Sequence, residues 1–109
     1  SEEEIQQAVR EAEMYEQEDG ERKGYYELHS ESEVLIAKTE QALKKAGKQL
    51  DRSEKHQIKS AMNQLKKSVV KMKPMKMQEN DAQQLQSEKA NLENLTAKLF
   101  SMAESDENR

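Results

Sequence analysis

Large apolar side chains are scarce in this sequence, and those present recur at steps of three and four residues. Val, Ile, Leu and Phe together supply 17 of the 109 residues. One run has steps of four, three, four and three: Ile58, Met62, Leu65, Val69 and Met72. This spacing places the side chains along one face of an α-helix. A chain with so few apolar residues can bury them only by packing several such faces together.

The same spacing recurs on both sides of this run. Upstream it is formed by Ile36, Thr39, Leu43, Ala46 and Leu50. Downstream it is formed by Leu85, Leu92, Leu95, Leu99 and Met102. The alternation typical of strands is absent over any useful length. We therefore expect an all-α fold, with helices at about 25–46, 53–72 and 80–103 in a small antiparallel three-helix bundle.

A further amphipathic helix is expected before the bundle, over residues 1–19, with Ile5 and Val9 on its apolar side. Ser1 and Glu4 have the spacing of a capping box that starts a helix. Gly20 and Gly24 mark either a bend before the bundle, which spans residues 20–103, or a weak joint in one longer helix. The first helix finds few partners within the chain and is expected to protrude as an arm.

Residues that start or end helices also mark the boundaries of the other helices. Asp51 and Glu54 have capping-box spacing before the second bundle helix, and Pro74 should end that helix because proline lacks an amide proton. The polar residues 104–109 are expected to form a frayed tail.

Charge is segregated along the chain, whose formal net charge is −4. Residues 1–21 contain nine acids and one base, whereas residues 38–76 contain twelve bases and three acids. A basic middle segment could bind nucleic acid or an anionic membrane. We favour lysines that coat solvent-exposed helix faces, because the segment has one arginine and no interleaved aromatic residues. Neither nucleic acid nor membrane is an expected partner.

Candidate catalytic chemistry is weak. His29 and Glu33 are four residues apart, as two ligands of a metal on a helix would be, but no third ligand is evident. The chain has no cysteine, no phosphate-binding glycine loop and no arrangement that indicates a catalytic triad. We expect no enzyme activity, no metal and no cofactor in this chain. Its longest apolar run, residues 34–37, is too short to span a membrane.

Four other side chains are candidates for an exposed interaction surface: Tyr25, Tyr26, Met75 and Met77. Adjacent tyrosines point in different directions on a helix, so at least one should be exposed or covered by a partner. Methionines can form an adaptable binding surface, although core or loop packing is the favoured role. The unpartnered arm together with Tyr25 and Tyr26 gives the hypothesis that the isolated chain self-associates, for example by exchanging helices.

The first thirteen residues carry the most specific pattern. They read Ser1-Glu-Glu-Glu-Ile-Gln-Gln-Ala-Val-Arg-Glu-Ala-Glu13, a cap followed by acids, an Ile and a Val-Arg-Glu-Ala-Glu run. This resembles the start of the helical lid in bacterial seventy-kilodalton heat-shock chaperones of the DnaK family. Weaker similarity continues through Glu33-Val-Leu-Ile36 and Thr39-Glu-Gln-Ala-Leu43 to residues 92–104.

The resemblance implies a lid that closes over a β-sandwich peptide-binding subdomain in the ADP state and opens with ATP. It implies lid-to-sandwich contacts at Asp19, His29, Ser30 and Glu33. Because His29 and Ser30 replace the family's Arg-Asn pair, those two contacts would differ from the family's. ATP and Mg²⁺ would bind elsewhere in a cytoplasmic parent chaperone. Its partners would be unfolded client peptides, a J-domain co-chaperone and a nucleotide exchange factor. The alternatives from the residues alone are an independent helical adaptor or a basic-surface binding module.

Overall fold

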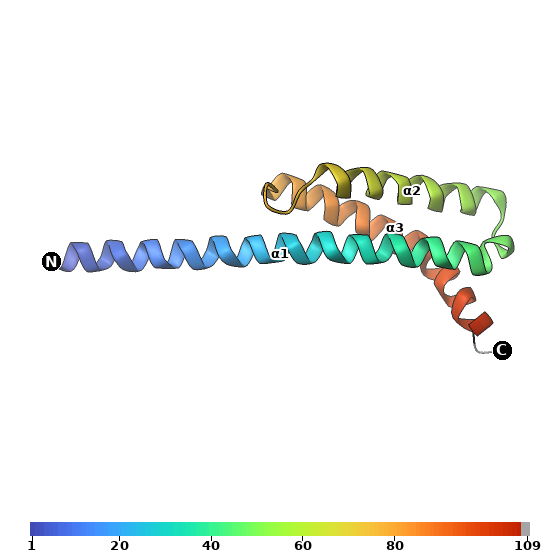
Figure 1. Ribbon diagram of the computed structural model, residues 1–109, viewed down its shortest axis with the longest axis horizontal. Coiled ribbons are helices and arrows are strands. Elements are labelled where there is room, and N and C mark those ends of the chain that lie inside the picture. The colour runs from blue at the N-terminus through green and yellow to red at the C-terminus, as the bar shows by residue number, and fades with distance from the viewer. Residues whose placement is uncertain (108–109) are drawn as a thin grey trace.

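The computed structural model describes residues 1–107 and contains three helices joined by short connections. Helix α1 spans Glu2–Ala46, the 3₁₀ turn η1 spans Gly47–Gln49, α2 spans Arg52–Lys71 and α3 spans Glu79–Glu107. No strand occurs within the described residues. Figure 1 shows α2 running antiparallel to α1 and α3 returning beside both. The all-α fold, with a protruding first helix and a three-helix bundle, is confirmed.

The bundle core consists of the apolar stripes that the spacing predicts. Leu65, Leu85, Leu92 and Leu99 are fully buried, and Ile58 is nearly so. The buried hydroxyls of Ser32, Thr39 and Thr96 each donate to the carbonyl oxygen four residues earlier. Such back-bonding satisfies a polar group inside an apolar interface at little cost.

Helix α1 is continuous from the first turn to the bundle, so no break separates a helix over 1–19 from one over 25–46. A Cβ atom added at Gly20 or Gly24 would meet no atom within 4 Å apart from the neighbouring backbone of α1 itself. Neither glycine therefore marks a close packing contact. The capping box of Ser1 and Glu4 is formed. With a rise of about 1.5 Å per residue, 45 helical residues span about 68 Å. This helix accounts for the longest dimension of the molecule, 70 Å.

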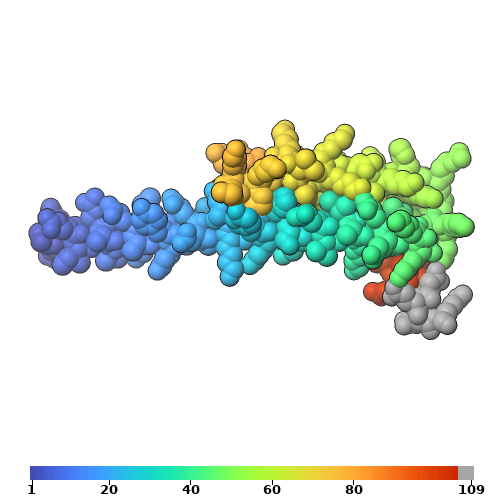
Figure 2. All heavy atoms as spheres, viewed as in Figure 1, coloured from blue at the N-terminus to red at the C-terminus, as the bar shows by residue number. Residues whose placement is uncertain are grey.

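Residues 1–21, all exposed, form a segment that we call the arm. The arm extends past the connection between α2 and α3 as a single helix, and Figure 2 shows it projecting from the thicker bundle. No other element of residues 1–107 covers it, so its side chains are stabilised by local helical contacts alone. The protrusion predicted from the sequence is therefore present and extends two residues further than expected.

Helix α2 begins and ends as its sequence predicts, whereas α3 is longer than expected. The Asp51 carboxylate accepts a 2.7 Å hydrogen bond from the Glu54 amide, and Pro74 lies in the turn after α2. Helix α3 begins at Glu79 and continues through Glu107. The tail predicted over 104–109 is thus helical through Glu107, and residues 108–109 lie outside the described part of the chain.

Ion pairs connect all three pairs of helices at the bundle surface. Lys89 of α3 pairs with Glu31 of α1 at 2.9 Å, and Lys98 of α3 pairs with Glu54 of α2 at 3.4 Å. Lys66 of α2 pairs with Glu40 of α1. Each pair has an exposed carboxylate and contributes about 1 kcal/mol or less, although the Lys89 side chain itself is only 15% exposed. Their main effect is to favour one register of packing.

Candidate interaction surface on the first helix

The two sides of α1 have different environments. The side that packs on α2 and α3 carries Tyr25, Leu28, Ser32, Leu35 and Thr39, which are buried or half-buried. The opposite side faces solvent along the bundle as well as along the arm. This division follows from helical geometry, because residues three, four and seven apart share a face.

The solvent-facing side carries a line of residues that we call the outer stripe. Its members follow steps of three, four or seven: Ile5, Val9, Ala12, Tyr15, Asp19, Tyr26, Ser30, Glu33 and Ala37. Ile5 and Tyr15 are 66% and 69% exposed, and Val34 beside the stripe is 63% exposed. Apolar side chains arranged this way on a free helix face are typical of a surface that a partner covers.

Three of the predicted lid contacts lie on the outer stripe. Asp19 is on the arm, whereas Ser30 and Glu33 lie farther along α1, beside the bundle. All three are exposed, and the Glu33 carboxylate also contacts the His29 ring. The structure therefore places these residues on one side of one helix, together with Tyr26. Their contact with a sandwich subdomain remains a prediction.

His29 lies at the interface between α1 and α2 and is not free to contact a partner. Its Nε2 is 2.8 Å from the carbonyl oxygen of Val69, and its Nδ1 is 2.9 Å from a Glu33 carboxylate oxygen. Val69 lies in the last turn of α2, where carbonyl groups lack helical partners. Both neighbours of the ring are hydrogen-bond acceptors, so the imidazole is held between α1 and the end of α2.

The candidate tyrosines and methionines divide between surface and core. Tyr26 is exposed, whereas Tyr25 is half-buried against the core, as expected for neighbours on a helix. Met75 is 74% exposed, but Met77 is only 1% exposed. The prediction that Met77 contributes to an exposed surface is wrong, because the chain turns after Pro74 and directs this side chain into the core.

Arg22 fixes the connection between α2 and α3 to α1, and sequence reasoning missed it. Its Nη1 donates hydrogen bonds to the carbonyl oxygens of Pro74 at 2.6 Å and Met77 at 2.9 Å. The guanidinium also lies over the Tyr25 ring, 5.3 Å from its centroid. The sequence shows only that Arg22 and Lys23 follow the acidic arm, which does not reveal partners more than fifty residues away.

Two titratable groups are shifted by specific neighbours. The hydrogen bond from the Lys89 ammonium to Glu31 raises the pKa of Lys89 above its ordinary value. The hydrogen bond from the Glu54 amide lowers the pKa of Asp51 below its ordinary value. In both cases the hydrogen bond stabilises the charged form of the side chain, the ammonium of Lys89 and the carboxylate of Asp51. Neither of these two groups lies on the outer stripe.

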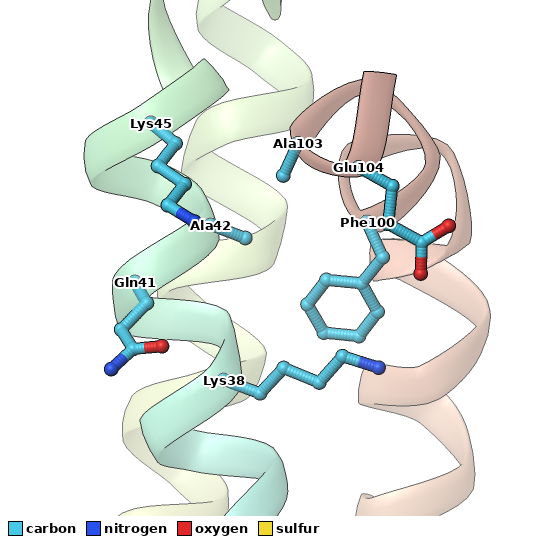
Figure 3. Close-up of a pocket in the computed structure, with 7 residues that line it drawn as sticks. All are labelled: Lys38, Gln41, Ala42, Lys45, Phe100, Ala103 and Glu104. Atoms are coloured by element: carbon cyan, nitrogen blue, oxygen red, sulfur yellow. The ribbon is translucent and has the colours of Figure 1, made fainter. Parts of the chain in front are cut away.

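The concave surfaces are shallow and carry no catalytic arrangement among the described residues. Figure 3 shows residues that line a pocket between the ends of α1 and α3, among them Lys38, Phe100 and Glu104. The pocket has a volume of about 200 Å³. The Lys38 ammonium lies 4.4 Å from the centre of the Phe100 ring. Within the described residues, no three His, Asp or Glu side chains are grouped as metal ligands. None of the three helices, over the described part of the chain, has the apolar length that a membrane span requires.

The fold is a helical bundle with one projecting helix. A family model described as Hsp70 protein matches residues 1–104 of this chain. The chain therefore belongs to the Hsp70 family, whose proteins act as heat-shock chaperones and bind client peptides. Comparison with curated proteins and with solved structures produced no match.

Proposed function

We propose that this chain is the helical lid of a DnaK-type chaperone and that the outer stripe of α1 docks on the β-sandwich that holds client peptide. The observation that carries this proposal is the stripe itself. It runs without interruption from the arm onto the bundle, on the side of α1 that neither α2 nor α3 covers. Closing the lid would slow client release, and detaching it would permit exchange.

Apolar contacts supply most of the docking free energy in this proposal. Burying a side chain such as Ile5, Val9 or Tyr15 contributes about 1.5–3 kcal/mol, whereas an exposed ion pair contributes about 1 kcal/mol or less. Asp19 and Glu33 would therefore orient the docked helix more than they hold it. The lid shifts the chaperone between states only through a difference in contact between those states.

The remaining parts of the mechanism belong to the parent protein. ATP and Mg²⁺ would bind in an ATPase domain outside these residues, so the chain itself would be non-catalytic. A J-domain co-chaperone, a nucleotide exchange factor and the unfolded client would act through that parent in the cytoplasm. In this arrangement the nucleotide state is transmitted to the client through the fraction of time that the outer stripe is docked.

The test is peptide release from the sandwich subdomain with residues 1–109 attached downstream and without them. We expect markedly slower release when the chain is attached. Ile5→Ala or Tyr15→Ala should then raise the release rate up to about tenfold, since 1.4 kcal/mol corresponds to a factor of ten. Met14→Ala is the matched control, because Met14 is 60% exposed on the same arm but lies off the outer stripe.

Charge variants refine the test. Asp19→Ala and Glu33→Ala should each raise the release rate by less than about fivefold, as expected for exposed pairs. Equal release rates with and without the attached chain would reject the lid function. An independent helical adaptor would then be the favoured function, tested by formation of a stable complex with a helical peptide.

A further inference from the structure

One face of α2 carries basic side chains that have no acidic partner. We call Arg52, Lys59 and Lys67 the basic face, since all three are exposed on the side away from the core stripe. None of the three takes part in an ion pair among the described side chains. The single acid of α2, Glu54, pairs instead with Lys98 of α3. The basic face is therefore electrostatically unbalanced within its own chain.

The arm carries the complementary feature. Glu4, Glu11 and Glu18 follow each other at steps of seven and form a line that we call the acidic line. Continuing along α1, the same side carries Arg22 and His29, which hold the end of α2 and its connection. The acidic line thus lies on the side of α1 that receives α2 in the bundle. Along the arm that side is empty.

The acidic line and the basic face match in length and spacing. The arm and the 20-residue helix α2 are each about 30 Å long. The step of seven between Glu4 and Glu11 is also the step between Arg52 and Lys59. When the two helices lie parallel in that register, Glu18 comes opposite Lys66, which already pairs with Glu40, and beside Lys67 of the basic face. All three acids of the line then face a base.

From this match we infer that two copies of the chain associate, with the arm of each lying parallel to α2 of the other. Contact within one molecule is excluded by geometry, because α1 is a single rod and its arm points away from its own α2 (Figure 1). A two-fold axis near the connection between α2 and α3 brings each arm alongside α2 of the other copy. Each arm then extends past the end of its own bundle and alongside the bundle of the other copy.

Two-fold symmetry doubles every contact, which offsets the weakness of single exposed pairs. The association depends on charge, so salt screens it. The outer stripe borders the acidic line at Tyr15, which lines one surface depression together with Glu11 and Glu18. The experiment that follows measures association of residues 1–109 alone, so its outcome does not depend on the lid proposal.

Sedimentation velocity of residues 1–109 over a wide concentration range tests the inference. A dimer is expected at low ionic strength and a monomer at about 0.5 M salt. Glu11→Lys with Glu18→Lys should weaken dimerisation at least tenfold, as should Lys59→Glu with Lys67→Glu. Combining all four substitutions in one chain restores opposite charges at each contact and should restore the dimer.

The control is Glu13→Lys with Glu16→Lys, which makes the same change in net charge on another side of the arm. This control should leave the dimer intact. Equal weakening by the control, or no rescue in the fourfold variant, would overturn the proposed register. A chain that stays monomeric at low salt, yet is retained on a polyanion through its basic face, would overturn the dimer and assign that face to nucleic acid or anionic lipid.

Discussion

The guanidinium of Arg22 donates a 2.6 Å hydrogen bond to the carbonyl oxygen of Pro74, fifty-two residues farther along the chain. This bond fixes the connection between α2 and α3 at the point where α1 leaves the bundle and becomes the arm. The same nitrogen also donates to Met77. One side chain therefore satisfies two carbonyl groups of a turn that has few hydrogen bonds of its own.

Replacing Arg22 by Ala should lower the free energy of unfolding by about 1–3 kcal/mol, because two part-buried carbonyl oxygens lose a charged donor. Urea unfolding followed by circular dichroism would measure the change. Lys23→Ala is the neighbouring control and should change stability by less than about 0.5 kcal/mol, since Lys23 is exposed. Equal effects of the two substitutions would show that the contact of Arg22 with the turn is not stabilising.

The two methionines after Pro74 should respond oppositely to truncation. Met77→Ala leaves a cavity in the core and should cost about 2–5 kcal/mol. Met75→Ala removes a solvated side chain and should cost less than about 0.5 kcal/mol. Thermal or urea unfolding of both variants provides the comparison. A small cost at Met77 would mean that the turn does not direct this side chain inward.

The two glycines inside α1 should be replaceable by alanine with a gain in stability. Each exposed helical glycine costs about 0.5–1 kcal/mol relative to alanine. Gly24→Ala, beside the bundle, should raise the global free energy of unfolding by that amount. Gly20→Ala, in the arm, should instead slow amide hydrogen exchange of the arm, which opens locally without unfolding the bundle. Loss of helix in either variant would indicate a bend at that glycine.

Asp51 should make stability depend on pH in the acid range. The amide of Glu54 lowers the pKa of Asp51 in the folded chain, whereas the unfolded carboxyl titrates near 3.8. The resulting stabilisation is fully present above that value and is lost as the pH falls through the lower, folded pKa. The Asp51→Asn variant keeps an oxygen acceptor at the helix start but does not titrate.

Unfolding of both proteins from pH 7 to pH 2 provides the measurement. The difference in stability should be constant above about pH 5 and should shrink below it. A difference that stays constant to pH 2 would show that the folded and unfolded pKa values of Asp51 are equal.

Local patterns predicted much of this fold. The three- and four-residue steps identified the core faces of all three helices, and cap spacing located the starts of α1 and α2. Helix interiors and caps depend on residues within one or two turns, so a sequence reading can recover them. The outer stripe was only partly predicted. The family resemblance pointed to Asp19, Ser30 and Glu33, but only the continuous α1 helix shows that they share one face.

The features that sequence reasoning missed depend on distant residues. Gly20 and Gly24 suggested a joint, but the many Glu, Gln, Ala, Leu and Lys residues on either side are good helix formers and outweigh two local penalties. Met77 follows a turn whose direction is set by packing against α1, and local spacing does not specify that direction. The partners of Arg22 and His29 are main-chain carbonyl groups, which every residue has and no pattern marks.

An unbroken α1 also determines how orientation is transmitted through the molecule. The arm and the part of α1 that packs in the bundle are one continuous helix. A surface that binds the first turns of α1 therefore determines the direction in which its other end points. A tilt of about 10° at the amino end moves the end at Ala46 by roughly 12 Å. Small changes in how the arm is seated therefore become large displacements of α2 and α3, with no rearrangement inside the bundle.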